Sequence, residues 1–396
     1  MIMIKKFFSL AMSALLLAGC AGNSVKKNDA KKTEEVKSYS APTKQQFEQK
    51  YKIVTDSANN KVILDADVTY INDDMYALFE LLQADKMGYI KLLGLTAAGG
   101  NALTSSVTYD VLSALEFFDR KDIPVAVGTD VPLNGFKNID SLMAVIGKMP
   151  YVGAYSQLPK YTDNYLKAKG VTTTSNLPEP TIKPIEETAW DFMIRQVNEN
   201  PGKVTIFAIG GYTNVAKAIQ KDPEFAKKAA GIVYMGGVFD VPGEALPRVE
   251  INWWYDPEAV NICLNAGWKK QLVIPHDAAT TCLKGKDMYD MYKAKNTTKI
   301  SQAIVDSLAP IYENGQEEFL KFCWDPITVA VYLCPDLIEK IEPREVAIER
   351  NMGLSYASCM AWFAGTGPKG TAPCDVVFKV KRDELWDFVS DLYSLQ

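Results

Sequence analysis

The sequence contains one histidine, no excess of basic residues and, after residue 20, no apolar run long enough to cross a membrane. A single histidine, with no cysteine pair at zinc-ligand spacing, gives little support for a zinc site. A net charge of -5 at pH 7 argues against a nucleic-acid-binding surface. The chain beyond residue 20 is therefore expected to fold without a membrane-spanning helix.

The first residues read as an export signal. Two lysines precede an apolar run over residues 7–18, which is too short for an ordinary membrane-spanning helix. Residues 17–20, Leu-Ala-Gly-Cys, resemble a bacterial lipoprotein box, in which the cysteine is lipidated and becomes the mature N-terminus. A plain signal peptide with an incidental cysteine is the alternative. We predict a lipoprotein signal peptide over residues 1–19 and lipidation at Cys20.

A polar stretch follows this signal. Residues 20–45 are rich in Lys, Asn, Ser and Glu and contain almost no apolar side chains, which is typical of a flexible tether. The whole chain is 47% hydrophobic and 23% charged, as in a globular protein. We therefore expect residues 46–396 to form one domain, held at a membrane through the lipid anchor only, in a periplasm-facing or cell-surface lipoprotein.

Six of the seven cysteines lie beyond residue 262. In an exported protein some of them could form disulfides, and Cys359 with Cys374 would close the nearest plausible loop. Buried free cysteine is equally a common small core residue. The sequence does not choose between these two states.

Strands and helices alternate along the domain. The expected strands are residues 61–64, 90–96, 123–127, 204–209, 231–235 and 271–275, and the expected helices are residues 74–84, 107–118, 188–198, 214–221 and 256–266. Uniformly apolar strands separated by helices indicate a parallel sheet covered on both faces. Residues 134–184 show no firm periodicity, so an insertion or a long irregular connection is expected there. The predicted fold class is α/β, with an open, mostly parallel central sheet and helices on both faces.

Polar residues follow these strands at their carboxyl ends. They include Asp67, Asn101, residues 209–211, Gly236-Gly237 and Asp277. Ligands of open parallel sheets bind outside this edge, so we expect the functional site there.

The densest polar group is VILDADVTYINDD, residues 62–74, which places four carboxylates after an apolar strand. Clustered carboxylates repel one another, so we expect a metal ion, a lysine from elsewhere in the fold or water to meet them. Taken alone, residues 65–69 match the DxDxT start of haloacid-dehalogenase-type phosphatases. Aspartates at a strand end are also common turn and helix-capping residues.

A longer series of motifs resembles the inosine-uridine preferring nucleoside hydrolase family. The blocks that carry the resemblance are residues 62–82, similar to DTDMGNDIDDALAL; residues 94–101, similar to G-V-T-x-x-x-G-N; residues 204–218, similar to V-T-L-V-A-x-G-P-L-T-N-x-A-x-A; residues 232–259, similar to I-V-x-M-G-G-x-F…A-E-x-N-x-W-x-D-P-E-A; Pro275-His276-Asp277, similar to P-x-D; and residues 324–330, similar to H-D-P-x-x-V-A. They occur in order from about residue 61 to the C-terminus, whereas the phosphatase pattern has no second block. The chain is identified as a divergent, lipoprotein-anchored member of this family.

The resemblance implies Ca²⁺-dependent hydrolysis of the N-glycosidic bond of nucleosides to free base and ribose. It assigns to Asp67 both Ca²⁺ binding and removal of the proton from the attacking water. Asp74 and Asp277 match the other carboxylate ligands, and a backbone carbonyl ligand falls at Ile209. A hard cation held in this way can orient a water molecule, lower the pKa of that water and bind two vicinal hydroxyl groups of the sugar.

The resemblance also implies the substrate contacts. Asn101, Glu250 and Asn252 match residues that hydrogen-bond the ribose, and Asp73 serves the ribose or the loop itself. Glu250 and Asn252 alternate along a segment expected to be extended, so they share one face. His276 matches a histidine that protonates a purine leaving group in some members, and a core or second-layer histidine is an equal alternative.

Departures from the family pattern keep other functions open. Ile71 stands where the pattern has an Asp, and Glu244 replaces a usual Asn. A non-hydrolysing nucleoside- or sugar-binding lipoprotein on the same fold is therefore the alternative function, with a DxDxT-type phosphatase a distant third. The expected partner is a small-molecule nucleoside or related N-glycoside, not a nucleic acid, and a homo-oligomer is expected.

Overall fold

The computed structural model describes residues 39–53, 56–158, 177–313 and 321–396. The predicted signal peptide, Cys20 and the first part of the predicted tether lie outside the described residues. No helix among the described residues is both long and apolar enough to cross a bilayer.

The folded body begins before the predicted domain boundary at residue 46. The Tyr39 hydroxyl donates to Oδ1 of Asp391 at 3.0 Å. Helix α1 (Lys44–Tyr51) starts at a capping box formed by Thr43 and buries Phe47 completely. Residues 39–45, predicted as tether, therefore belong to the body, because Tyr39 hydrogen-bonds the C-terminal helix and Thr43 caps α1.

The sheet has ten strands among the described residues, in the order β4-β3-β2-β1-β5-β6-β7-β10-β8-β9. Their bounds are β1 (Lys61–Ala66), β2 (Lys91–Ala97), β3 (Val125–Val127), β4 (Ile185–Thr188), β5 (Val204–Ala208), β6 (Gly231–Met235), β7 (Gln271–Ile274), β8 (Ile338–Ile348), β9 (Cys359–Phe363) and β10 (Ala372–Val380). The pairings from β4 through β7 to β10 are parallel, and β8 pairs antiparallel with β10 and β9. The predicted open, mostly parallel sheet is confirmed.

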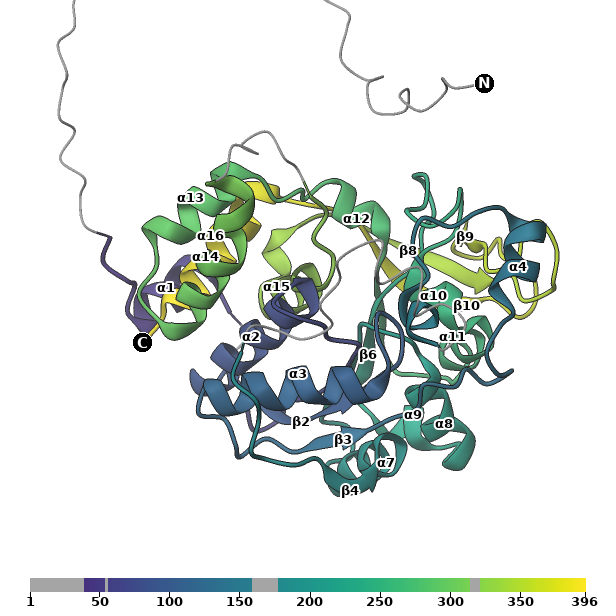
Figure 1. Ribbon diagram of the computed structural model, residues 1–396, viewed down its shortest axis with the longest axis horizontal. Helices are drawn as coiled ribbons and strands as arrows, with labels where there is room; N and C mark the ends of the chain where they lie inside the picture. Colours follow the sequence, from purple (N-terminus) through teal and green to yellow (C-terminus); the bar gives the residue numbers. More distant parts are fainter. Residues whose placement is uncertain (1–38, 54–55, 159–176, 314–320) are drawn as a thin grey trace, which may run out of the picture. The chain divides into compact units, whose positions relative to one another are not determined.

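Helices cover both faces of the sheet (Figure 1). The helices after α1 are α2 (Asp73–Lys86), α3 (Thr104–Phe117), α4 (Ile139–Ile146), α7 (Ala189–Glu199), α8 (Thr213–Lys221), α9 (Phe225–Lys228), α10 (Ile251–Tyr255), α11 (Pro257–Leu264), α12 (His276–Thr280), α13 (Lys286–Ala294), α14 (Lys299–Tyr312), α15 (Asp325–Leu333) and α16 (Arg382–Ser394). Val62 and Leu64 of β1 pack in one core with α2, α3 and α13–α16, whereas Ile63 packs in the other core with α7, α8 and α11. Alternate side chains of a strand point to opposite faces, which is why this strand is apolar throughout.

The chain changes direction at β1. After β1 it builds β2, β3 and β4 on one side, then returns to place β5 on the other side of β1. Such a switch point opens a crevice at the carboxyl ends of the two strands. The acidic stretch after β1 therefore lies where this architecture binds ligands.

Two local expectations were wrong. Residues 134–184 are not wholly irregular, because α4 forms within them, starting where the Asn138 side chain accepts the N–H of Ser141. The segment after Glu250 is not extended, because Glu250 caps the five-residue helix α10 that contains Asn252. The six cysteines beyond residue 262 are buried free thiols.

Candidate active site

The carboxylates of the 62–74 stretch gather where β1 ends and α2 begins. Asp67 follows β1 and is fully buried, while Asp73 and Asp74 form the first turn of α2 and are 5% and 1% exposed. The partial positive charge of a helix N-terminus favours carboxylates there. Ile71 is partly buried and packs against the core, so it adds no charge to the site.

Asp65 has a different environment from these three. Its Oδ1 accepts hydrogen bonds from the Thr96 hydroxyl at 2.6 Å and from the Asn214 side chain at 2.9 Å. These bonds tie β1 to β2 and to the start of α8. Asp65 is therefore a structural residue of the sheet edge.

Asp325 joins the cluster from a distant part of the chain. It is the first residue of α15, which packs on α2, and one carboxylate oxygen each of Asp73, Asp74 and Asp325 lies within 4.8 Å of the others. The backbone N–H of Trp324 also faces Oδ2 of Asp73 at 3.5 Å. Asp325 lies in the Trp-Asp-Pro motif of a block that resembles the family, and it was not among the predicted site residues. An Asp before Pro at a helix start, inside a matched family block, was the available signal.

Asp277 does not join the cluster of Asp73, Asp74 and Asp325, although the resemblance assigned it the third ligand position. Its two oxygens accept backbone N–H groups of Phe239 at 2.9 Å and Asp240 at 2.7 Å. Both oxygens are thus used to hold the loop after β6. The structure places Asp325, not Asp277, beside the acidic residues of α2.

The clustered carboxylates are incompletely satisfied. Oδ1 of Asp67, Asp74 and Asp325 is buried and has no hydrogen-bond partner among the described residues. Burial raises the pKa of Asp67 to about 6, although the neighbouring Asp74 side chain and the hydrogen bond from the Asn101 backbone lower it. Burial and the charges of neighbouring carboxylates raise the pKa of Asp74 and of Asp325 well above the ordinary value. Buried, unpaired oxygens of this kind fit a hard cation, which takes oxygen ligands.

Two glycines shape the space around Asp67. A Cβ atom on Gly100 would lie 2.0 Å from Oδ2 of Asp67, and one on Gly210 would lie 2.8 Å from Oδ1. The carboxylate therefore packs directly against backbone on both sides. This close approach orients Asp67 without a charged partner.

Amide side chains connect the carboxylates to the neighbouring strand ends. The backbone N–H of Asn101 donates to Oδ2 of Asp67 at 2.5 Å, and its side-chain amide donates to Oδ2 of Asp74 at 3.2 Å. The side-chain amide of Asn252 donates to the carbonyl of Ile209 at 2.9 Å. The structure thus brings five predicted site residues to one edge of the sheet: Asp67, Asp74, Asn101, Ile209 and Asn252.

Glu250 is buried and serves as the N-cap of α10. Its oxygens accept the backbone N–H groups of Asn252 at 2.8 Å, Trp253 at 3.0 Å and Gly237 at 3.0 Å. It therefore fixes α10, and with it Asn252, against the turn that follows β6. Its predicted contact with a sugar would have to share oxygens that already accept backbone hydrogen bonds.

His276 lies in an aromatic wall beside the cluster. Nδ1 accepts the indole N–H of Trp324 at 2.9 Å, and the ring centroid is 4.9 Å from that of Phe322. Burial lowers the pKa of His276 to about 4, so the ring is neutral at pH 7. Oε2 of Glu244 lies 3.6 Å from Nδ1, and burial raises the pKa of Glu244 to about 7.

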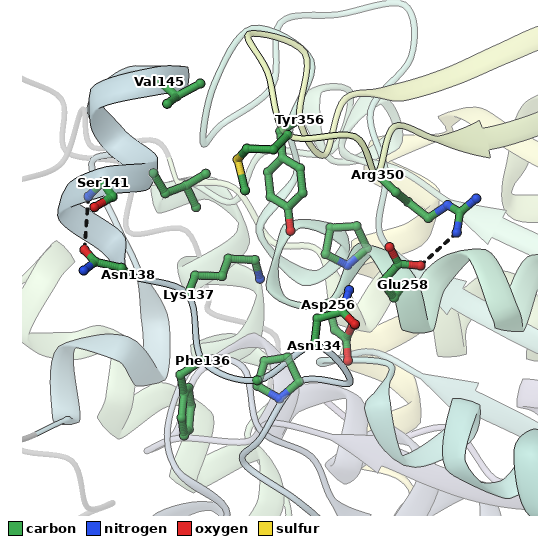
Figure 2. Close-up of a pocket in the computed structure, with 15 residues that line it drawn as sticks. Asn134, Phe136, Lys137, Asn138, Ser141, Val145, Asp256, Glu258, Arg350 and Tyr356 are labelled. Carbon is green, nitrogen blue, oxygen red and sulfur yellow. Dashed lines mark hydrogen bonds and ion pairs between the residues drawn. The ribbon is translucent and has the colours of Figure 1, made fainter.

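A cavity of about 420 Å³ opens on another part of the surface, and its lining is shown in Figure 2. The residues labelled there come from the segment around α4, the start of α11 and the segment before β9. Lys137 lies in this lining, and its ammonium donates to the Trp254 carbonyl at 3.1 Å. None of the predicted site residues lines this cavity, so it is separate from the carboxylate cluster.

Comparison with known proteins gives a consistent result. The family model of inosine-uridine preferring nucleoside hydrolase matches residues 62–387. The probable uridine nucleosidase 1 of Oryza sativa subsp. japonica is 30% identical, over 84% of this chain and 96% of that protein. The pyrimidine-specific ribonucleoside hydrolase RihA of Enterobacter sp. (strain 638) is 28% identical, over 73% of this chain and 83% of that protein.

Solved structures agree with the fold. A plant nucleoside hydrolase, the PpNRh1 enzyme, superposes with a TM-score of 0.68 at 25% identity, covering 85% of this chain and all of that chain. An inosine-guanosine nucleoside hydrolase superposes with a TM-score of 0.69 at 19% identity, covering 85% of this chain and 99% of that chain, which supports the fold alone. Neither comparison gives support to a phosphatase or to a non-hydrolysing binding protein.

Proposed function

The chain belongs to the inosine-uridine preferring nucleoside hydrolase family and is a nucleoside N-ribohydrolase, and we propose that it hydrolyses pyrimidine nucleosides such as uridine with bound Ca²⁺. The observation that carries the metal proposal is the group of buried carboxylates with unpartnered oxygens at the switch point of the sheet. Asp67, Asp74 and Asp325 would hold the cation, with the carbonyl of Ile209 as a further oxygen ligand. When bound, Ca²⁺ would supply a Lewis acid that lowers the pKa of a water molecule.

Asp67 is the proposed general base. Its Oδ2 is fixed by the Asn101 N–H, which leaves Oδ1 as the oxygen that can take a proton from water. Its buried position against Gly100 and Gly210 excludes bulk solvent from that proton. Hydrolysis passes through an oxocarbenium-like sugar, so a negative carboxylate nearby also favours the transition state.

Asn101, Asp73 and Asn252 are the proposed contacts of the ribose hydroxyls. Each presents a polar side chain at the same sheet edge, and Asn252 is held in place by the cap that Glu250 provides. Hydrogen bonds to vicinal hydroxyls would orient the sugar for attack. Glu250 supports the contact between Asn252 and the ribose indirectly, because it caps the helix α10 that carries Asn252.

The proposed pyrimidine preference rests on two observations. Relatives with the names uridine nucleosidase and pyrimidine-specific ribonucleoside hydrolase cover most of this chain. His276 accepts a hydrogen bond at Nδ1 and has a lowered pKa, so it is not charged at neutral pH to protonate a purine. His276, Phe322 and Trp324 would form an apolar wall against which a base can stack.

A nucleoside panel tests this function. Purified protein is incubated with uridine, cytidine, inosine and guanosine, with EDTA or with Ca²⁺, and free ribose is measured. Uridine should give the highest kcat/KM, EDTA should abolish turnover and Ca²⁺ should restore it. Asp67→Asn should reduce kcat by about 100- to 10,000-fold, as removal of a general base does. Ribose release unaffected by EDTA would contradict the metal proposal, and a preference for inosine would contradict the base preference.

The proposed localisation is a membrane lipoprotein anchored through Cys20. The lipoprotein box at residues 17–20 supports it. The full chain expressed in a Gram-negative host should fractionate with membranes, and Cys20→Ser should release it to the soluble fraction. Equal membrane association of the two proteins would contradict the anchor.

The proposed homo-oligomer uses the surface around the cavity of Figure 2. Apart from Tyr70, the large apolar side chains that are exposed among the described residues lie in segments 131–151 and 341–363. Phe136, Val145 and Met352 from these two segments line the same cavity. Contiguous exposed apolar surface is typical of an interface. Light scattering after size exclusion should show a multimer that Leu354→Glu dissociates, and a monomeric wild type would contradict it.

A further inference from the structure

The segment over residues 150–157, which follows α4, packs against the loop that leaves β2. The N–H of Ala154 donates to the carbonyl of Gly100 at 2.7 Å. Gly153 has a positive φ of 52°, and a Cβ atom there would lie 2.1 Å from the same carbonyl oxygen. The two stretches of backbone are therefore in direct contact, which requires glycine at position 153.

Tyr151 of this segment contacts a predicted site residue. Its hydroxyl oxygen lies 3.2 Å from Oδ1 of Asn101 and 3.2 Å from the backbone carbonyl oxygen of the same residue. Both of these oxygens are acceptors, so the hydroxyl donates its proton to them. The Tyr151 side chain is 39% exposed, so this contact lies at the surface of the site and not inside a core.

The contacts of Asn101 determine which way its amide group faces. Nδ2 donates to Oδ2 of Asp74 at 3.2 Å, because a carboxylate oxygen accepts hydrogen bonds. Oδ1 is therefore turned away from Asp74, and it is the atom that receives the Tyr151 hydroxyl. A partner at each end restrains the terminal torsion of the amide, which is otherwise broad. Nδ2 carries a second hydrogen, which is the donor that a ribose hydroxyl oxygen can accept.

The segment that carries Tyr151 is supported by a core of its own. Val152 and Tyr155 are buried in a third hydrophobic cluster together with Trp254 of α10. The ring centroids of Tyr155 and Trp254 are 5.5 Å apart. Trp254 lies two positions after Asn252, so the same core supports both Tyr151 and the helix that carries the other amide of the site. Precise positioning of a contact residue requires support of this kind.

We propose that Tyr151 is a positioning residue whose hydroxyl sets the orientation of the Asn101 amide toward the ribose. The inference rests on the ribose contact of Asn101 in the proposed function. Without the Tyr151 hydroxyl, the amide can rotate and present an acceptor where the sugar needs a donor. The ribose hydroxyl that Asn101 holds does not itself react, so the hydroxyl of Tyr151 contributes to substrate binding. Its loss should therefore change KM and not kcat.

Steady-state kinetics with uridine at saturating Ca²⁺ separate these two effects. Tyr151→Phe removes only the hydroxyl, so it should raise KM by about 2- to 12-fold, the contribution of one hydrogen bond, and leave kcat unchanged. Its melting temperature should be close to that of the wild type, since the side chain is partly exposed. Gln157→Leu is the matched control, because Gln157 lies in the same segment but accepts the N–H of Leu103, the cap residue of α3, at 2.9 Å. The control should lower the melting temperature and leave KM unchanged.

A double-mutant cycle tests whether Tyr151 acts through Asn101. In the Asn101→Ala background, Tyr151→Phe should give no further rise in KM, because the amide that it orients is absent. An equal rise in both backgrounds would overturn the positioning role. An unchanged KM in Tyr151→Phe, a loss confined to kcat, or an equal rise in the Gln157→Leu control would also overturn it. A wild-type protein that releases no ribose from uridine, cytidine, inosine or guanosine would instead overturn the proposed function, and the inference with it.

Discussion

The indole nitrogen of Trp324 donates a hydrogen bond to Nδ1 of His276 across 2.9 Å. This bond determines the tautomer of the imidazole, because an accepting Nδ1 leaves the proton on Nε2. It also joins the segment that carries Asp325 to the first residue of α12. This one side-chain hydrogen bond therefore fixes the position of the aromatic wall relative to the segment that carries Asp325.

Acid should destabilise the protein through His276. Its folded-state pKa of about 4 lies below its ordinary value of 6.5, so the unfolded chain takes up a proton before the folded protein does. The stability that this group contributes is present above pH 6.5 and is lost as the pH falls through 4, by up to about 3 kcal/mol. Urea unfolding at pH 7.5 and pH 4 should show a smaller loss for His276→Gln than for the wild type. Equal losses would contradict a neutral buried ring.

Replacing Asp325 should weaken metal binding much more than replacing Asp277. Changes next to a metal ligand cost 10- to 100-fold in affinity, so Asp325→Asn should weaken Ca²⁺ binding by about 100-fold or more. Asp277→Asn should leave the Ca²⁺ affinity within about tenfold of the wild-type value, since the oxygens of Asp277 accept backbone N–H groups. Calorimetric titration of the two folded variants measures the difference. The reverse order would restore Asp277 as the ligand.

The stabilisation that Ca²⁺ gives should grow with pH. Without a cation, burial raises the pKa of Asp67 to about 6, above the ordinary value of 3.8, so the folded protein holds a proton that the unfolded chain releases. The associated stability is present below pH 3.8 and is lost as the pH rises through 6. Bound Ca²⁺ would take the place of this proton, and it should restore the stability that is lost at high pH. The rise in melting temperature on adding Ca²⁺ should be larger at pH 8 than at pH 5, and an equal rise would contradict the site.

A methyl group at Gly100 should damage the metal site. The added Cβ would lie 2.0 Å from Oδ2 of Asp67, so Gly100→Ala must displace that carboxylate. Overpacking of this kind costs about 1–3 kcal/mol of folding stability. Returning the carboxylate to its place beside the cation would cost a similar amount, which weakens Ca²⁺ binding by about 5- to 150-fold. Gly353→Ala is the control, because a Cβ there meets nothing within 4 Å. Wild-type affinity in the Gly100 variant would show that Asp67 is not held as described.

The sheet and the start of the site were predictable because their signals are local. The apolar run over residues 61–66 is buried on both faces, and the acids that follow it occupy the end of β1 and the first turn of α2. Helix α10 was not predictable in the same way. It has only five residues and depends on Glu250, whose side chain accepts backbone N–H groups from three residues. A single capping side chain leaves no periodic pattern in the sequence.

The choice between Asp277 and Asp325 shows a different limit. Each aspartate lies in the first turn of a short helix and inside a block that resembles the family. What separates them is which helix packs on α2, and this depends on contacts between parts of the chain far apart in sequence. The Asp-Pro pattern marks Asp325 as a helix start, but a local pattern does not encode which helix packs on α2. The antiparallel strands β8–β10 depend on long-range pairing in the same manner.

The hydrogen bond between Trp324 and Asp73 spans 251 positions of the chain. During synthesis, the acidic loop and α2 leave the ribosome long before α15 exists, and contacts of such sequence separation form late in folding. A product terminated before residue 325 would keep every acid of the 62–74 stretch and still lack the carboxylate that completes the cluster. Cation binding would therefore distinguish the full-length chain from a product that ends before residue 325.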